Sequence, residues 1–590
     1  MEGLFVIEIN NKQPYRRKEE YLFCDGFLSV FADEKAMSRC FLYDEEEALV
    51  FAELSTLHNE SAEDKQKYIS SFLTTSSQVK KLQWGFVLHY NRKKKIVRLI
   101  NDIFGLYPLY YHQKDQRIII SNRIKALSQI LDVISLNYTG VLDFFLFNYT
   151  LLDRTLIKDI NQLKGGSKIY IENNCISISQ HERLSQIVHK EGNSRVSIDK
   201  TSIPFVNCIN NGLNKQLQNN VAITGGFDSK IVLASMLRSG NSFNTYTFGT
   251  RGSVDHILGE KTSEKFGLNH SFLDLGIDFQ NKLNANIECF ISKVANPVLM
   301  TLLNYELVNN EFSDSNIITG KMGGEMITGP VIISEVVATR TAKTLINGLS
   351  IDKLKDSLIS DLRYLSFLNM DVISQSIDNY LKSLQPYIAN NQEQIKDNYI
   401  DFLSNELYAK FFGVVFSVLY PKHNMINPFM DFDFLKSILR TKISIVNNEP
   451  FTTNPFAHLA SRKLYAQMVK EIFPPVLNTY LDRGYMLKDV ISIYRFPSIA
   501  FRYIKNHYFR KRSSVSSNQV NDMKLLQKLV IDVLPDSNIS KSDLINREEL
   551  LRHIQSIKRN SFDAYILRKL ILLLGLDYFN NGLKETNKYV

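Results

Sequence analysis

The chain has 590 residues, more than one hydrophobic core usually organises, so two or more domains are expected. Hydrophobic residues make up 44% and charged residues 22% of it, as in a soluble globular protein. The net charge of +9 is a mild basic bias, which suits an anionic ligand such as a nucleotide and does not require nucleic acid.

The cysteines are scattered, and no two of them form a Cys-x-x-Cys pair, which argues against a zinc site or a disulfide framework. No basic segment followed by an apolar core begins the chain, so no signal peptide is expected. The longest apolar runs, such as residues 411–420, have about half the length that spans a bilayer. We therefore expect a cytoplasmic protein with neither a membrane nor a nucleic-acid partner.

Residues 1–185 have the pattern of a β-rich domain. Short apolar runs are separated by charged or turn residues, and they stand at 4–7, 27–31, 85–88 and 96–100. The basic segment 91–95 is most simply a solvated hairpin turn between two of these strands. A helix is predicted over 136–152 and a strand over 169–178. The prediction is a mainly antiparallel sheet domain.

A polar segment, residues 186–200, is predicted to be a linker. After it, strands and helices alternate through residues 201–500, which favours a parallel α/β sheet. The predicted order is strand 221–224, helix 230–238, strand 245–248, helix 255–266 and strand 316–319. Helices follow at 352–368 and 395–412. Residues 501–590 form a helical extension with a basic run at 502–512, most simply a solvated helix face, and a last helix at 564–574.

Residues 224–229 have the features of an anion site. A short apolar strand ends at two glycines and a helix follows, so backbone N–H groups and the helix dipole would face a ligand. Asp228 in this turn suggests Mg²⁺ bridging a carboxylate and phosphate oxygens. The spacing is not that of a Walker A loop, and an ordinary βα turn is the alternative. Glycines also follow the strands at 249 and 320–324, and all three strand ends would meet at one crevice.

Several segments resemble known sequence signatures. Residues 224–229 (Thr-Gly-Gly-Phe-Asp-Ser) resemble the Ser-Gly-Gly-x-Asp-Ser loop of ATP pyrophosphatases, and residues 102–111 are similar to the Asp-x-x-Gly-x-x-Pro-Leu-Tyr-Tyr signature of the asparagine synthetase family. The resemblance continues in the family's order at 121–127, 155–166, 248–255, 319–325 and 427–431.

This resemblance implies a glutaminase-like (Ntn) sandwich followed by an ATP-pyrophosphatase synthetase domain, with ATP and Mg²⁺ as cofactors. The family joins a carboxylate to an amine through an acyl-adenylate. It implies that Asp228 holds the metal. The backbone of Gly225, Gly226 and Ser229 would hold the pyrophosphate, and Phe248, Gly249, Thr319 and Gly320 would hold the adenosine. Thr224 is a further nucleotide-binding residue implied.

The chain departs from the family at three places. Glutamine-hydrolysing members carry a nucleophilic cysteine at position 2, where this sequence has Glu2, so we expect no glutaminase activity. Acids usual in the family are replaced by Lys321 and Gly324, so the second metal ligand is uncertain. Lys321 would meet phosphate or carboxylate, or is a surface lysine, and Glu325 is a nearby candidate.

The third departure is Asp482, which stands where the family has a lysine. Arg483 or Lys488 would take over that charge, or the segment forms a structural salt bridge. The catalytic candidates are therefore Lys321, Glu325 and Arg483.

The leading hypothesis is an ATP-dependent, AMP-forming amide ligase that takes an amine directly from a small-molecule or peptide substrate. Branches of the family without the cysteine include β-lactam synthetases and lasso-peptide cyclases. A lasso-peptide macrolactam cyclase is the favoured form, whose partners would be a precursor peptide and its protease. The alternatives are an asparagine synthetase that uses free ammonia, and a non-catalytic ATP-binding scaffold.

Overall fold

The computed structural model describes most of the chain, namely residues 4–9, 20–54, 84–173, 175–186, 198–276, 294–327, 339–348, 350–439, 455–492, 494, 497, 517–559 and 563–584. The fold class is α/β, with antiparallel sheets in the N-terminal part and a parallel sheet with many helices after it. This confirms the predicted class. Most of the predicted linker, 187–197, and the basic run 502–512 lie outside the described residues, and the domain boundaries stay predictions.

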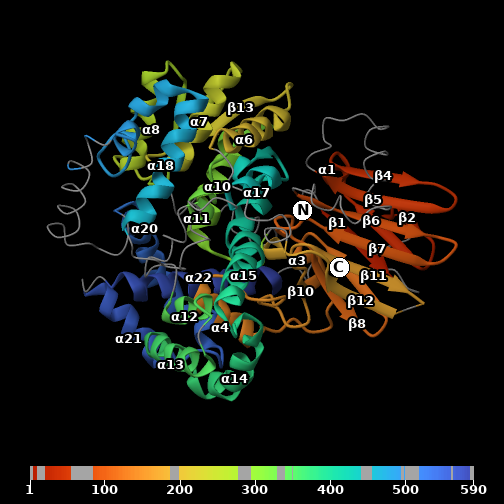
Figure 1. Cartoon of the computed structure of the whole chain (residues 1–590). Coiled ribbons are helices and arrows are strands. Elements are labelled where there is room, and N and C mark those ends of the chain that lie inside the picture. The colour runs from red at the N-terminus through yellow and green to blue at the C-terminus, as the bar shows by residue number, and fades with distance from the viewer. Residues whose placement is uncertain are drawn as a thin grey trace.

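The N-terminal part is built from two antiparallel sheets that face each other (Figure 1). The first has the order β10-β8-β9-β1-β3-β2, with β10 (Asn161–Gln162), β8 (Tyr110–Lys114), β9 (Arg117–Ser121), β1 (Phe5–Ile9), β3 (Leu28–Ala32) and β2 (Phe23–Cys24). The second has the order β12-β11-β7-β6-β5-β4, with β12 (Cys175–Gln180), β11 (Ser167–Glu172), β7 (Ile96–Asn101), β6 (Gly85–Asn91), β5 (Ala48–Leu54) and β4 (Cys40–Asp44). Short helices accompany them: α1 (Glu34–Met37), α3 (Ile124–Ser128) and α4 (Tyr138–Phe147).

Four predicted strands are confirmed as β1, β3, β6 and β7, and the basic segment 91–95 forms the β6–β7 hairpin. The prediction of one strand over 169–178 was wrong, because the chain reverses there between β11 and β12. Asn173, at the turn, has a φ of 50°, a left-handed conformation that asparagine adopts more readily than most residues.

The third sheet is parallel throughout, with the order β15-β14-β13-β16-β17. Its strands are β13 (Gln218–Ala222), β14 (Asn244–Gly249), β15 (His270–Asp274), β16 (Ser315–Ile318) and β17 (Asn424–Ile426). Its helices include α6 (Ile198–Gly212), α7 (Phe227–Ser239), α8 (Val254–Lys265), α10 (Leu299–Glu311), α11 (Gly323–Ile327), α17 (Phe432–Leu439) and α18 (Pro455–Ile472). The alternating strands and helices predicted from 221 onward are confirmed.

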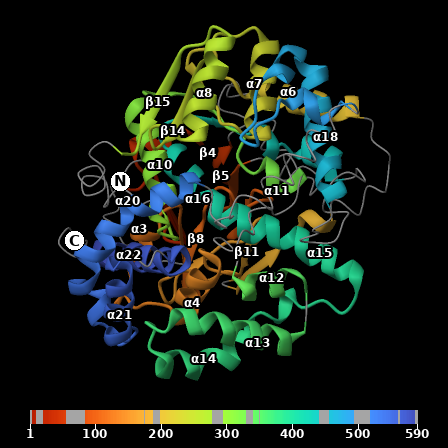
Figure 2. The same ribbon diagram turned by 90° about the vertical axis from the view of Figure 1, so that its left-hand side faces the viewer.

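A second helical layer lies below this sheet in Figure 2. It contains α12 (Arg340–Ile346), α13 (Ile351–Leu362), α14 (Met370–Ser383), α15 (Gln392–Phe402), α20 (Ser517–Val533), α21 (Arg547–Lys558) and α22 (Ala564–Lys584). The helix predicted to end at 574 continues to 584. Its Lys569 is buried and donates to the Phe145 carbonyl at the end of α4, so α22 packs on the central core.

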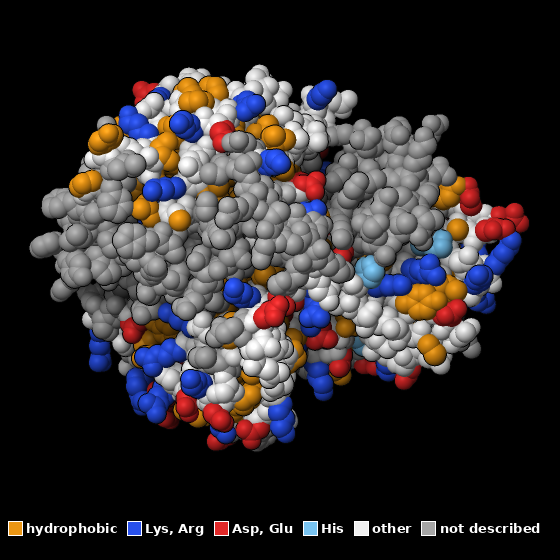
Figure 3. All heavy atoms as spheres, viewed as in Figure 1, with side chains coloured by type: hydrophobic (Ala, Val, Ile, Leu, Met, Phe, Trp, Pro, Cys, Tyr) orange, Lys and Arg blue, Asp and Glu red, His pale blue; other side chains and the backbone are white. Residues whose placement is uncertain are grey.

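One long helix crosses the centre of the molecule. It runs through α15, the π-helix η6 (Leu403–Phe412) and α16 (Gly413–Leu419). Within the described part of the chain, 393–419 is the helix long and apolar enough to cross a membrane, and 94% of its most apolar window is buried in the protein. On the face shown in Figure 3, Lys and Arg side chains of the described residues are dispersed among acidic ones.

The sandwich packs against this long helix through the turn that follows β7. Asp102 is fully buried there and accepts hydrogen bonds from four backbone N–H groups, including those of Leu106 at 3.0 Å and Tyr107 at 3.1 Å. Burial raises the pKa of Asp102 to about 7, against the opposing effect of these donors. The Ser404 hydroxyl of η6 donates to the Ile103 carbonyl at 3.4 Å. Residues 102–109 of the signature therefore form a structural turn, and its last two residues begin β8.

Candidate active site

The glycine loop joins β13 to α7. The helix begins at Phe227, three residues earlier than predicted, with Gly226 as an extended N-cap. Asp228 and Ser229 consequently lie in the first helical turn, where a negative charge interacts favourably with the helix dipole. A Cβ atom on Gly225 would come within 2.8 Å of the Leu258 side chain and 3.0 Å of the Asp482 backbone nitrogen, so the close packing favours glycine at that position.

The loop is closed by its own hydrogen bonds. The Ser229 hydroxyl lies 3.0 Å from the Thr224 carbonyl, to which it donates, and it accepts from the Thr224 N–H at 3.2 Å. The Gly226 N–H donates to the Thr224 hydroxyl, and the Gly225 N–H donates to Asp255 at 2.9 Å. Two of the N–H groups predicted to hold pyrophosphate therefore have protein acceptors in this structure.

Asp228 is held from two sides. Its Oδ1 accepts a hydrogen bond from the Tyr465 hydroxyl of α18, and its Oδ2 accepts one from the Gly324 N–H at 3.2 Å. Burial raises the pKa of Asp228 to about 6, and the Tyr465 and Gly324 bonds and the nearby charges of Arg483 and Lys321 oppose this rise. The backbone of Gly324 thus contacts the carboxylate at the position where the family has a second acid.

The ends of β14 and β16 flank the loop. The Phe248 ring at the end of β14 meets the Tyr305 ring of α10 edge-on, with centroids 5.4 Å apart. The Thr319 N–H after β16 donates to the Ile426 carbonyl at 3.0 Å. Gly320 lies so close that a Cβ atom there would meet the Asp228 carbonyl carbon at 2.9 Å. The glycine-containing ends of β14 and β16 therefore lie next to the loop, as the prediction for a parallel sheet required.

These strand ends open into one cavity of about 440 Å³. Its volume is in the range of small-molecule sites. The predicted residues that line it are Thr224, Gly226, Asp228, Ser229, Phe248, Thr319, Gly320 and Lys321. Its other lining residues are Ala222, Ile223, Tyr246, Thr247, Asp255, Thr301, Tyr305, Met322, Phe411, Phe412 and Val415.

Four predicted residues are not among those that line the cavity. Gly225 follows β13, and Gly249 is the last residue of β14, where it has a φ of 146°. The guanidinium carbon of Arg483 lies 5.4 Å from the centre of the Phe227 ring. Glu325 belongs to α11, and its side chain lies outside the described residues.

Behind the loop lies the buried Lys230, with the charges of Asp255 and Asp482 near it. The Lys230 ammonium donates to the Thr262 hydroxyl at 3.0 Å, and burial lowers the pKa of Lys230 to about 8, while Asp255 and Asp482 oppose this fall. The Asp482 N–H donates to the Gly225 carbonyl at 3.0 Å. The backbone of Asp482, the residue expected from the resemblance to stand at a lysine position, therefore supports the back of the loop.

The described residues contain no group of three or more histidine, cysteine, aspartate or glutamate side chains placed to hold a metal. Asp228 offers one carboxylate at the cavity, and Mg²⁺ in phosphate sites commonly takes one or two carboxylates together with phosphate oxygens. The donor set fits a cation that arrives with a nucleotide.

Sequence reasoning missed Tyr465 and the aromatic residues Tyr305, Phe411 and Phe412. None of them belongs to a motif, and each reaches the site from an element distant in sequence. An alternation of apolar residues indicates burial, and it does not tell a core residue from one that lines a cavity.

Comparison with known proteins identifies one part of the chain. Residues 70–182 match the family model described as a glutamine amidotransferase domain. This confirms an amidotransferase-like domain in the N-terminal part, which indicates an enzyme. No curated protein matches this chain.

Two solved structures are similar over part of the chain. One is glutamine phosphoribosylpyrophosphate amidotransferase from B. subtilis complexed with ADP and GMP, with 10% identity, a TM-score of 0.19, and coverage of 46% of this chain and 60% of that one. The other is described as the allosteric regulatory enzyme of purine biosynthesis, with 10% identity, a TM-score of 0.20, and coverage of 46% and 59%. The chain therefore spans about three fifths of either protein.

Proposed function

We propose that this protein is an ATP-dependent, AMP-forming amide ligase that adenylates a carboxylic acid. The observation that supports this most is the single cavity at the ends of β13, β14 and β16, lined by Asp228, Phe248 and Thr319. A nucleotide would place its phosphates at the α7 N-terminus and its adenosine toward Phe248 and Thr319.

In the proposed reaction, a carboxylate oxygen of the acid attacks the α-phosphorus of ATP. The bond between that phosphorus and the oxygen that bridges it to the β-phosphorus breaks, and pyrophosphate leaves. An amine nitrogen then attacks the acyl carbon, the bond to AMP breaks, and the nitrogen loses a proton. Mg²⁺ held by Asp228 would neutralise charge on the leaving pyrophosphate.

The roles of the protein residues follow from their positions. The N-terminus of α7 would stabilise the negative pyrophosphate through its dipole. Lys321 lines the same cavity as Asp228, and its charge opposes the rise in the pKa of Asp228, so it would act on phosphates bound there. Arg483 packs on Phe227 at the edge of the loop and would act on the phosphates through the charge it adds there.

ATP–pyrophosphate exchange with the full-length protein tests this proposal, because it reports adenylation without knowledge of the amine. Exchange that depends on an added carboxylic acid is expected. Asp228→Asn should reduce it about 100-fold or more, since a catalytic metal supplies several kcal/mol. Asp433→Asn, on the exposed side of α17, is the matched control and should leave it unchanged. Exchange that is unaffected by Asp228→Asn would contradict the proposal.

One observation favours a second candidate, a nucleotide-binding scaffold without chemistry. Both Asp228 oxygens and two loop N–H groups are already hydrogen-bonded within the protein. ATP binding in calorimetry without exchange for any acid would favour the scaffold.

The macrolactam cyclase is the intramolecular form of the proposed ligase. Loss of one water mass from a precursor peptide with ATP and Mg²⁺ would test it.

A further inference from the structure

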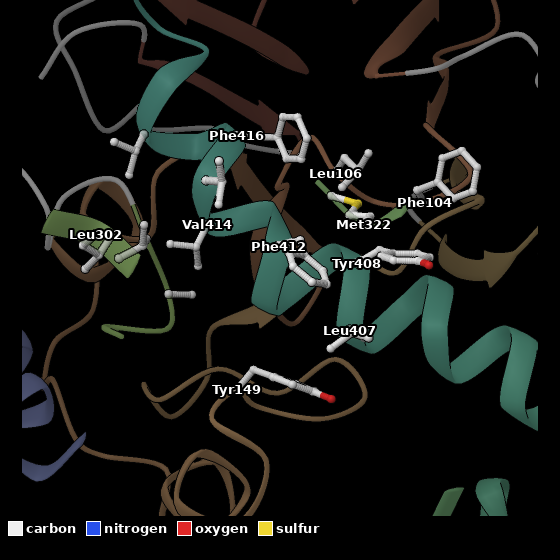
Figure 4. Packing of buried hydrophobic residues seen from close by; sticks show 14 of the residues in the cluster. Phe104, Leu106, Tyr149, Leu302, Met322, Leu407, Tyr408, Phe412, Val414 and Phe416 are labelled. Atoms are coloured by element: carbon white, nitrogen blue, oxygen red, sulfur yellow. The ribbon is translucent and has the colours of Figure 1, made fainter. Parts of the chain in front are cut away.

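The cavity has a second wall that does not belong to the glycine loop. It is formed by Tyr305 of α10 and by Phe411, Phe412 and Val415 of the long central helix, with Met322 beside them. Figure 4 shows Met322 and Phe412 in the same apolar cluster as Leu106 of the N-terminal part. This wall is apolar and mainly aromatic, whereas the wall at the loop carries hydroxyl and carboxylate groups.

The aromatic wall is firmly held. Tyr305, Phe412 and Val415 are 4%, 6% and 2% exposed. Phe411 and Phe412 contact each other edge-on with centroids 5.1 Å apart. They are the last two residues of the π-helix η6, and such segments commonly occur at functional sites. The wall is therefore preformed, and a ligand would not need to order it.

Lys321 stands where the two walls meet. Its ammonium nitrogen lies 5.5 Å from the centre of the Tyr305 ring, within the range of a cation–π contact. The charge of the same ammonium also opposes the rise in the pKa of Asp228. Among the described residues that line the cavity, Lys321 supplies the single basic side chain. An anionic group that binds beside the aromatic wall would thus meet Lys321.

We propose that this half of the cavity binds the acid to be activated, and that this acid has an aromatic or branched apolar body. Its carboxylate pairs with Lys321, next to the phosphates, and its body packs on Tyr305, Phe412 and Val415. This assignment rests on the proposed ligase function. A small polar acid such as aspartate would leave the apolar wall uncovered and its second charge without a basic partner on that wall.

The test is exchange by the full-length protein with 3-phenylpropanoate and 4-methylpentanoate, compared with aspartate and acetate. We expect an acid-dependent rate at least about 10-fold higher for the apolar acids, because each buried methylene contributes about that discrimination. Calorimetry with 3-phenylpropanoate is done in parallel on protein saturated with a non-hydrolysable ATP analogue. Greater exchange with aspartate than with either apolar acid would overturn the substrate assignment and leave the ligase proposal standing.

The two proposals fail in different ways. Binding of 3-phenylpropanoate without exchange would support the apolar acid site and refute the ligase. Neither binding nor exchange for any acid would overturn both.

Two variants of the central helix locate the acid. Phe412→Leu should lower the preference for 3-phenylpropanoate over 4-methylpentanoate by about 10-fold, since a hydrophobic pocket discriminates by that order. Phe416→Leu, one turn away on the same helix and outside the lining residues, is the matched control and should keep the preference. If Phe412→Leu instead weakens ATP binding and leaves acid preference unchanged, the wall belongs to the nucleotide site and the proposal is wrong.

Discussion

Gly323→Ala should disable the site while the fold persists. A Cβ atom on Gly323 would lie 2.6 Å from Oδ1 of Asp228, 2.6 Å from Cε1 of Phe429 and 2.7 Å from Cζ of the same ring. Phe429 is fully buried and packed edge-on against Phe205 at 4.9 Å, so it has little room to move. The Asp228 carboxylate must therefore move, or the backbone at 323 must withdraw from it.

The size of the effect follows from this crowding. Overpacking of a well-filled core costs about 1–3 kcal/mol. For a large domain each kcal/mol lowers Tm by about 2–4 °C, so a modest fall is expected. The catalytic loss should be greater, because displacing a catalytic group by about 1 Å can reduce the rate about 100-fold. Gly323→Ala should thus lose about 100-fold in ATP–pyrophosphate exchange, with the full-length protein still folded.

The matched control is Gly413→Ala in the central helix. There the new Cβ atom would meet its nearest neighbour, the Tyr408 carbonyl oxygen, at 3.4 Å, an ordinary contact. Exchange should be retained, and Tm should be unchanged or slightly higher. Wild-type exchange and Tm in Gly323→Ala would show that residue 323 and Asp228 do not pack as closely as the distances state, and the reasoning would be refuted.

Three further predictions concern stability and the N-terminal part. Lys410→Met leaves Glu406, the buried partner of its 3.0 Å ion pair, without its cation, and should cost about 3–5 kcal/mol in urea unfolding; adding Glu406→Gln should recover most of that loss. Burial lowers the pKa of His423 from 6.5 to about 4, so the folded protein keeps this imidazole neutral where the unfolded chain would protonate it. The free energy of unfolding that depends on this neutral form is therefore present above about pH 6.5 and is lost as the pH falls toward 4. His423→Asn should therefore flatten the decline in Tm between pH 7 and pH 4.5. Purified protein should release no glutamate from glutamine. Burial and Glu53 raise the pKa of the Cys40 thiol, which disfavours the thiolate that would act as the nucleophile. Measurable glutamate release would contradict this expectation.

The glycine loop could be predicted because its chemistry is local. Two glycines between an apolar strand and a helix, with Asp228 next, constrain the backbone over a few residues. The hydrogen bond from Tyr465 to Asp228 could not, because it joins residues 237 positions apart and depends on how α18 packs on α7. The start of α7 was misplaced by three residues, since the helix already includes Phe227 and Asp228 once Gly226 serves as its cap.

The error at 169–178 has a local cause. Ile169 and Ile171 alternate on odd positions, and Ile176 and Ile178 alternate on even ones, so the phase changes between the two pairs. The prediction overlooked this change, which marks the reversal at Asn173 between the two strands. The π-helix at 403–412, in contrast, has no signal of its own, because its sequence has the apolar spacing of the helix around it. Its contacts are with residues distant in sequence: Lys410 donates to the Leu152 carbonyl at 2.5 Å.

The N-terminal part contributes to the candidate site independently of any glutamine chemistry. Asp102 fixes the turn at 103–107 through three N–H bonds from within it, and this turn places Gly105 so that a Cβ atom there would touch the Ala409 side chain at 3.5 Å. Ala409 belongs to the π-helix whose last two residues form the aromatic wall of the cavity. A rigid wall requires support from behind, and this turn supplies it. The signature turn of the amidotransferase-like domain therefore has a structural role at the cavity that does not depend on glutamine hydrolysis.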